Sequence, residues 1–154
     1  MLHKPNHDVR TQAFCGPTAM SAITGLPISL IRDAVREVSG LIETASGAAH
    51  PIMGMRNAWL TDAMALLGWR VIESEEYRQP HIRRNYQSPM SPPRLGDFCA
   101  ERGNDGPFIV NVTGHYVAVG FGEICDTFTS IPIDISGYNR RMGRWVLRWW
   151  KFAA

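Results

Sequence analysis

Helix-forming and strand-forming segments are separated along this chain, and their order constrains the fold more than any other feature. Between residues 15 and 68, apolar side chains mostly recur at helical spacing, as in "ISLIRDAVREVS", where one face is apolar and the other charged. After residue 107 the sequence consists mainly of β-rich runs such as "FIVNV", "HYVAVGF" and "RWVLRWWKF". This order predicts an α+β fold in which N-terminal helices pack on a mostly antiparallel C-terminal β-sheet.

Glycine and proline residues mark the expected ends of these elements. We expect helices over about 15–24, 27–39 and 57–67, a strand over 69–74, a short helix over 94–102 and strands from 108 onward. In the third helix, one apolar stripe is expected to face the core: Trp59, Ala63, Leu66 and Leu67. Residues 75–94 contain four prolines and no periodicity, so we predict a long loop that borders the functional cleft.

The composition suits one domain and does not favour a disulfide-rich, secreted or membrane-spanning protein. A chain of 154 residues, 45% of them hydrophobic, can bury a core without disulfides, so we expect a single domain over 1–154. The cysteines Cys15, Cys99 and Cys125 show no CxxC spacing, which predicts neither a disulfide framework nor a metal site, and we expect no cofactor. No signal-peptide core and no run of roughly 20 apolar residues is present. We therefore expect a cytoplasmic protein without a membrane partner.

The cysteine in "TQAFCGPTAM" stands where a thiol can be activated. Cys15 precedes Gly16, Pro17 and a run of small helix formers, so it lies in the first turn of the expected helix. Free backbone N–H groups and the positive end of the helix dipole favour an anion there, which lowers the pKa of a thiol. Without further partners, a cysteine in such a helix is more often a small hydrophobic side chain. Residues elsewhere in the chain decide between the two interpretations.

A histidine and a carboxylate provide the partners that a thiolate nucleophile needs. In "GHYVAVGFGEICDTF", His115 begins an apolar strand, a tight turn at "FGE" reverses the chain, and Asp126 ends the next strand. A hairpin about this turn brings Asp126 alongside His115, so the carboxylate can orient the imidazole as a general base. Cys125 alternates with Asp126 and is expected to point to the opposite face of the sheet.

These motifs resemble those of the papain-like cysteine peptidases, and in particular their compact C39-like bacterial branch. The resemblance runs from about Gln12 to Ser130 and includes "CGPTAM", "GHYVAV" and "CDT", with "LTDAMALLGWRV" between them. It implies a papain-like domain in which Cys15 is the nucleophile, His115 the general base and then the acid, and Asp126 the orienting residue. It also implies that Gln12 and the Cys15 backbone N–H form the oxyanion hole. Gln12 stands three residues before Cys15, where the family places its glutamine five or six before.

The function implied by this resemblance is that of a thiol hydrolase. It would cleave a peptide, isopeptide or other amide bond in a peptide or protein substrate. The small size, the missing export signal and the absence of accessory domains would suit a bacterial or bacteriophage protein. An alternative is a catalytically inactive binding module on the same fold, since a fold does not guarantee its chemistry. The unusual spacing of Gln12 favours this alternative.

The C-terminal stretch "NRRMGRWVLRWWK" suggests a further, weaker alternative, the binding of nucleic acid by its arginines and tryptophans. The net charge of +2 does not favour such a partner. Strand alternation favours a structural role, with two sets of side chains on opposite faces: Trp145, Leu147 and Trp149 on one, and Val146, Arg148 and Trp150 on the other.

Overall fold

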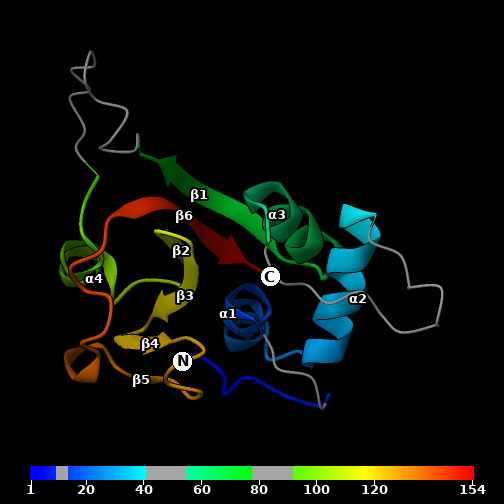
Figure 1. Cartoon of the computed structure of the whole chain (residues 1–154), viewed down its shortest axis with the longest axis horizontal. Helices are drawn as coiled ribbons and strands as arrows, with labels where there is room; N and C mark the ends of the chain where they lie inside the picture. Colours follow the sequence, from blue (N-terminus) through cyan, green and yellow to red (C-terminus); the bar gives the residue numbers. More distant parts are fainter. Residues whose placement is uncertain (10–13, 41–54, 78–91) are drawn as a thin grey trace.

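The computed structural model describes residues 1–9, 14–40, 55–77 and 92–154 and confirms the α+β class (Figure 1). The helices of the described residues are α1 Cys15–Thr24, α2 Ile28–Ser39, α3 Asn57–Leu66 and α4 Leu95–Arg102. The strands are β1 Arg70–Glu76, β2 Phe108–Val112, β3 His115–Gly120, β4 Glu123–Cys125, β5 Ile133–Asp134 and β6 Val146–Ala153, with a short 3₁₀ turn at Ile135–Gly137.

The strands form one six-stranded sheet in the order β1-β6-β2-β3-β4-β5, and every neighbouring pair is antiparallel. The last strand therefore lies inside the sheet, between the first strand and the β2–β3 hairpin. Consecutive strands β2, β3, β4 and β5 are neighbours, as expected for antiparallel hairpins. This arrangement fixes β3 and β4 side by side, and these two strands position the candidate functional residues.

Apolar side chains on the two faces of the sheet build two cores. One core packs α1, α2 and α3 against sheet residues such as Tyr116, Ala118 and Trp150. The other packs α4 against the opposite face, including Phe108, Val117 and Trp149. Figure 1 shows the corresponding layers, with α1 to α3 on one side of the sheet and α4 on the other. The predicted packing of N-terminal helices on an antiparallel sheet is thus confirmed.

The face that α3 turns to the core differs from the prediction. Leu60, Ala63 and Met64 are buried, whereas 54% of the Leu66 surface is exposed. Most residues of "NAWLTDAMAL" are apolar, and they occur on all sides of the helix, so helical periodicity alone cannot select the buried face. Packing against α2 and β1 selects it instead.

The predicted alternation of β6 is only partly correct. Trp149 and Trp150 do lie on opposite faces, and both are buried, with 2% and 1% of their surfaces exposed. Val146, however, shares the core of Trp149 and not that of Trp150. An irregularity in the pairing of β2 with β6 places Asn111 opposite Arg148 but Val112 opposite Val146, which shifts the alternation by one residue. Because Trp149 and Trp150 are buried, neither is a platform on which bases can stack.

Two further points concern the predicted loop after β1 and membrane-spanning helices. The proposed cleft-bordering loop falls mainly on residues 78–91, which lie outside the described residues. Within the described part of the chain, no helix combines the length and the apolar character that crossing a membrane requires.

Candidate active site

Cys15 is the first residue of α1, and its side chain is half-buried against the helical core. The helix begins there because Pro17 suits a first turn, where its missing N–H costs nothing, and it ends at Gly25, whose φ of 73° suits a left-handed cap. The preceding residue, Phe14, provides no side-chain cap for the helix N-terminus. The thiol therefore lies where the helix presents free N–H groups, as predicted.

The surroundings of Cys15 favour its thiolate. Burial raises the pKa of the Cys15 thiol, but hydrogen bonds with the His115 side chain and the Tyr116 backbone, the charge of His115 and a hydrogen bond with the Gly16 backbone outweigh it. The net pKa lies below the ordinary thiol value of 9.0. Such a lowered pKa is what a thiol nucleophile requires.

The pKa values of the other two cysteines are raised and not lowered. Burial raises the pKa of Cys99 to about 12 and that of Cys125 to about 11. Cys125 belongs to the core between the sheet and helices α1 to α3, so it points away from Asp126, as the alternation of β4 predicts. Cys15 is thus the only cysteine of this chain whose environment favours the anion.

Two tight hairpins position His115 and Asp126. The β2–β3 turn places Thr113 and Gly114 at positive φ, 33° and 77°, and His115 follows directly as the partner of Val112. The β3–β4 turn places Phe121 and Gly122 at φ of 58° and 79°. Positive φ at both central residues matches the twist of antiparallel strands and fixes their register.

The register of the β3–β4 hairpin brings the predicted pair together. Ala118 pairs with Cys125, so the following residue, Asp126, lies on the face and at the end of the sheet where His115 lies. His115 Nε2 and Asp126 Oδ2 are 3.2 Å apart, and both side chains are buried. The sequence predicted this contact between His115 and Asp126 from the tight turn at "FGE".

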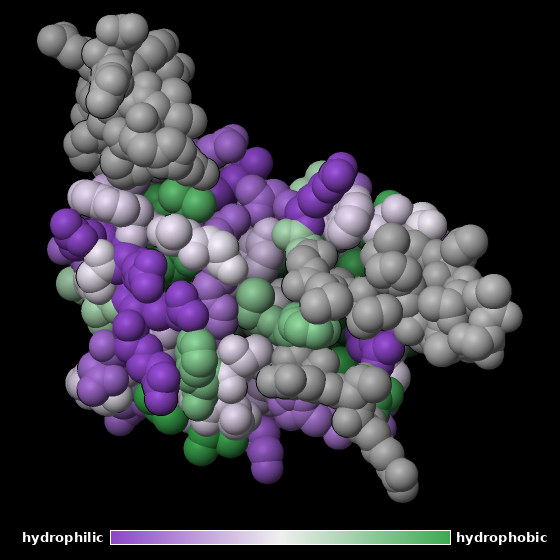
Figure 2. Space-filling model, in the orientation of Figure 1, coloured by the Kyte–Doolittle hydropathy of each residue, from purple (hydrophilic) through white to green (hydrophobic). Residues whose placement is uncertain are grey.

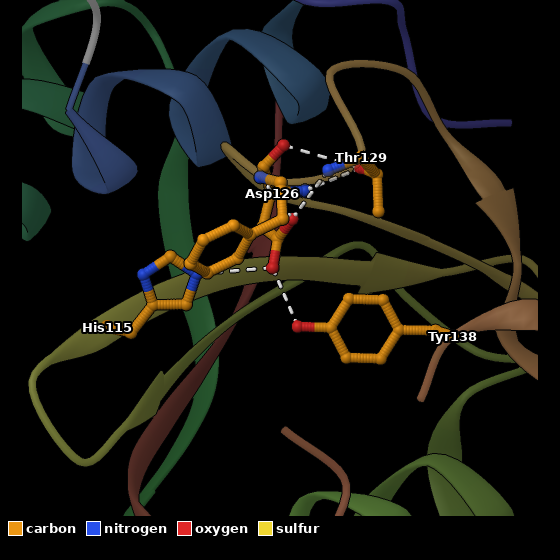
Figure 3. Close-up of polar contacts among 5 residues, drawn as sticks. His115, Asp126, Thr129 and Tyr138 are labelled. Carbon is orange, nitrogen blue, oxygen red and sulfur yellow. Dashed lines mark hydrogen bonds and ion pairs between the residues drawn. The ribbon is translucent and has the colours of Figure 1, made fainter. Parts of the chain in front are cut away.

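Asp126 is held by donors on both of its carboxylate oxygens (Figure 3). Oδ1 accepts the backbone N–H groups of Phe128 at 2.8 Å and Thr129 at 3.0 Å. Oδ2 accepts the hydroxyl of Tyr138 at 2.6 Å and faces His115. Burial raises the pKa of Asp126, but these hydrogen bonds, above all those with His115 and Tyr138, leave it below its usual range. Asp126 is therefore a buried, ionised carboxylate fixed in one orientation.

His115 lies between this carboxylate and the thiol. Burial lowers the pKa of His115, but hydrogen bonds with Asp126 and Cys15 outweigh it and raise the net pKa above 6.5. Figure 3 shows the second ring nitrogen directed away from Asp126. Since Nε2 faces Asp126, Nδ1 is the nitrogen available to Cys15. A raised histidine pKa and a lowered thiol pKa together favour a thiolate–imidazolium pair.

The structure places His115 against Asp126, as predicted, and His115 also affects the pKa of Cys15. Gln12 lies outside the described residues. Sequence reasoning missed Thr129 and Tyr138, which hold Asp126. Thr129 left a local signal, because Asp and Thr three residues apart often close a turn by side-chain hydrogen bonds. Tyr138 left none, since its contact with Asp126 depends on how β5 and the 3₁₀ turn fold back.

A search for metal ligands and a comparison with known proteins complete the description of the site. Among the described residues, no group of three or more His, Cys, Asp or Glu side chains could hold a metal ion. Comparison of the chain with known protein families, curated proteins and solved structures finds no significant match.

Proposed function

We propose that this protein is a thiol hydrolase in which Cys15 attacks an amide bond of a peptide or protein substrate. The observations that support this most strongly are the 3.2 Å contact of His115 Nε2 with Asp126 Oδ2 and the mutual influence of His115 and Cys15, which lowers the pKa of the thiol and raises that of the imidazole. The resemblance of "CGPTAM" and "GHYVAV" to papain-like cysteine peptidases supports the same assignment. The fold would then be a compact papain-like one.

In the first half of the reaction, the Cys15 thiolate forms a bond to the carbonyl carbon of the scissile amide. The carbonyl electrons move to oxygen, and the His115 imidazolium then gives its proton to the leaving nitrogen as the C–N bond breaks. An amine departs and a thioester on Cys15 remains. Asp126 stabilises the imidazolium and holds its orientation throughout.

In the second half, neutral His115 removes a proton from a water molecule, which attacks the thioester carbonyl. The C–S bond breaks, a carboxylic acid departs, and the thiolate–imidazolium pair is restored. The negative oxygen of both tetrahedral intermediates needs hydrogen-bond donors. The Cys15 backbone N–H, in the first turn of α1, would be one, and the resemblance assigns Gln12 as the other.

Cleavage of a complex peptide mixture tests this proposal. The protein is incubated with peptides from a digested proteome, and new termini are identified by mass spectrometry. We expect cleavage by the wild type, none by Cys15→Ala or His115→Ala, and retained folding in both variants. Cleavage that persists in Cys15→Ala would contradict the proposal. A biological activity and partner binding unaffected by Cys15→Ala would instead identify a binding module.

A further inference from the structure

An exposed phenyl ring links His115 to two arginines at the edge of the candidate active site. The Phe128 ring lies 5.5 Å from the His115 ring, centroid to centroid, and 47% of its surface is exposed. The guanidinium carbons of Arg140 and Arg141 lie 4.8 Å and 4.9 Å from the centroid of the same phenyl ring. We call Phe128, Arg140 and Arg141 the basic cluster. Figure 2 shows a hydrophilic surface over α4 and the segment before β6, to which these arginines belong.

The arginines of the basic cluster have no anionic partner among the residues that the structure describes. The ion pairs of those residues involve other cations, namely Arg36, Arg102, His115 and Arg148. Arg141 Nε is buried, and no described residue accepts a hydrogen bond from it. Two guanidinium groups on one ring also repel each other. A bound anion would relieve this repulsion.

The charge of Arg141 reaches the reacting groups. Burial and the hydrogen bonds with Asp126 and Cys15 have larger effects on the pKa of His115, but Arg141 also acts on it and lowers it. Since the Phe128 ring, on which both arginines lie, is 5.5 Å from the His115 ring, an anion held by the basic cluster would lie near His115. The phenyl ring of Phe128 offers an apolar surface for the carbon chain that carries such an anion.

We propose that the basic cluster binds a carboxylate of the substrate next to the bond that Cys15 attacks, so that the substrate is a peptide with a carboxylate close to the scissile bond. This proposal rests on the proposed function, because it assumes that Cys15 is the nucleophile. The carboxylate belongs either to an Asp or Glu side chain or to a free C-terminus, since both present the same planar group to a guanidinium.

Two alkylating reagents of nearly equal size test the proposal directly. Iodoacetate carries a carboxylate and iodoacetamide does not, so the ratio of their rates at Cys15 reports attraction of the anion at a given thiolate fraction. We expect Arg140→Gln combined with Arg141→Gln to lower this ratio about fivefold at low ionic strength. Arg140→Gln alone, at an exposed position, should lower it by a smaller factor, and 0.5 M salt should reduce both effects.

Arg144→Gln is the matched control, because Arg144 is an exposed arginine of the same segment. The ratio of iodoacetate to iodoacetamide rates in Arg144→Gln should equal that of the wild type. The His115 imidazolium also attracts iodoacetate, but it does so equally in the wild type and in the control. An unchanged ratio in both Arg140→Gln and the double variant, or an equal decrease in Arg144→Gln, would overturn this proposal. If Cys15 reacts with neither reagent below pH 7, the proposed function fails instead.

Protection by short peptides distinguishes the two sources of the carboxylate. Acetyl-Gly-Glu-Gly-amide, acetyl-Gly-Gln-Gly-amide and acetyl-Gly-Gly with a free C-terminus are compared as protectors of Cys15 against iodoacetamide. Stronger protection by the Glu peptide than by the Gln peptide identifies a side-chain carboxylate, and protection by the third peptide identifies a terminal one. Equal protection by all three at equal concentration, unaffected by the double variant, would contradict the proposal.

Discussion

Cys15 at the start of α1 is half-buried and Cys99 inside α4 is buried, and the net pKa shifts of the two thiols are opposite. Burial raises the pKa of Cys99 to about 12, because no neighbouring group stabilises its anion. Burial also raises the pKa of Cys15, but His115 and the backbone of Tyr116 and Gly16 outweigh it. The difference indicates that burial raises the pKa of a thiol in this fold unless neighbouring groups oppose it, as His115 and the backbone of Tyr116 and Gly16 do at Cys15.

Removal of His115 should have the largest effect, because it makes the environment of Cys15 like that of Cys99. In His115→Ala, the hydrogen bond and the charge of His115 no longer oppose burial, and the pKa of Cys15 should rise. The rate of Cys15 alkylation by iodoacetamide at pH 6 should then fall by about tenfold or more, since the thiolate fraction below the pKa falls as the pKa rises. His3→Ala, at an exposed histidine, is the control and should react as the wild type does. A near-normal rate in His115→Ala would show that His115 does not activate Cys15.

Asp126→Asn should have the next largest effect. The change keeps the shape of the side chain but removes the charge that supports the imidazolium, so the pKa of His115 should fall. We expect hydrolysis to decrease by about 10², less than the roughly 10⁴ of a serine enzyme, because a thiol ionises partly without help. The alkaline limb of the pH–rate profile should move to lower pH.

Asp134→Asn, at an exposed carboxylate in β5, is the matched control for this change. It should leave the rate and the alkaline limb as they are in the wild type. An alkaline limb that stays in place in Asp126→Asn would show that Asp126 does not support His115.

Tyr138→Phe should shift the same limb in the opposite direction. The Tyr138 hydroxyl and His115 share one oxygen of Asp126, so loss of the hydroxyl leaves this oxygen to His115 alone. The pKa of His115 should rise, the alkaline limb should move to higher pH, and the rate should change by less than about tenfold. The free energy of unfolding should decrease by about 1 kcal/mol. A shift to lower pH would mean that Tyr138 positions Asp126 rather than competing for it.

The smallest effect should be on how the free energy of unfolding depends on pH. The pKa of Asp126 is lowered on folding, so its contribution is present above 3.8 and is lost as the pH falls through the folded value. The pKa of His115 is raised, so its contribution is present below 6.5 and is lost as the pH rises through the folded value.

The difference in unfolding free energy between wild type and Asp126→Asn should therefore be largest between about pH 4 and 6.5. Chemical denaturation at a series of pH values measures it. A difference that stays constant from pH 3 to 9 would contradict the ionised Asp126–His115 pair.

Local signals in the sequence were sufficient for much of the site. Pro17 and Gly25 delimit α1 and place Cys15 at its start, and the tight turn at Phe121 and Gly122 determines the meeting of His115 with Asp126. These features depend on few neighbouring residues, so local chemistry predicts them.

Features that depend on distant contacts were not predicted. The position of β6 between β1 and β2, the buried face of α3 and the irregularity beside Val146 result from packing among segments far apart in the sequence. The hydrogen bond of Tyr138 to Asp126 depends on the course of the chain after β4, which no periodicity describes. The papain-like assignment, the role of Gln12 and the catalytic activity stay predictions.

The pH dependence of Cys15 alkylation tests the central claim most directly. Iodoacetamide labelling of the intact protein, followed by mass mapping of Cys15, Cys99 and Cys125, gives a rate for each thiol from pH 4 to 10. If His115 and Asp126 activate Cys15, its rate should stay high well below pH 9 and exceed the rates of Cys99 and Cys125 at pH 6. A Cys15 rate that falls tenfold for each pH unit below 9, as for an ordinary thiol, would contradict this account.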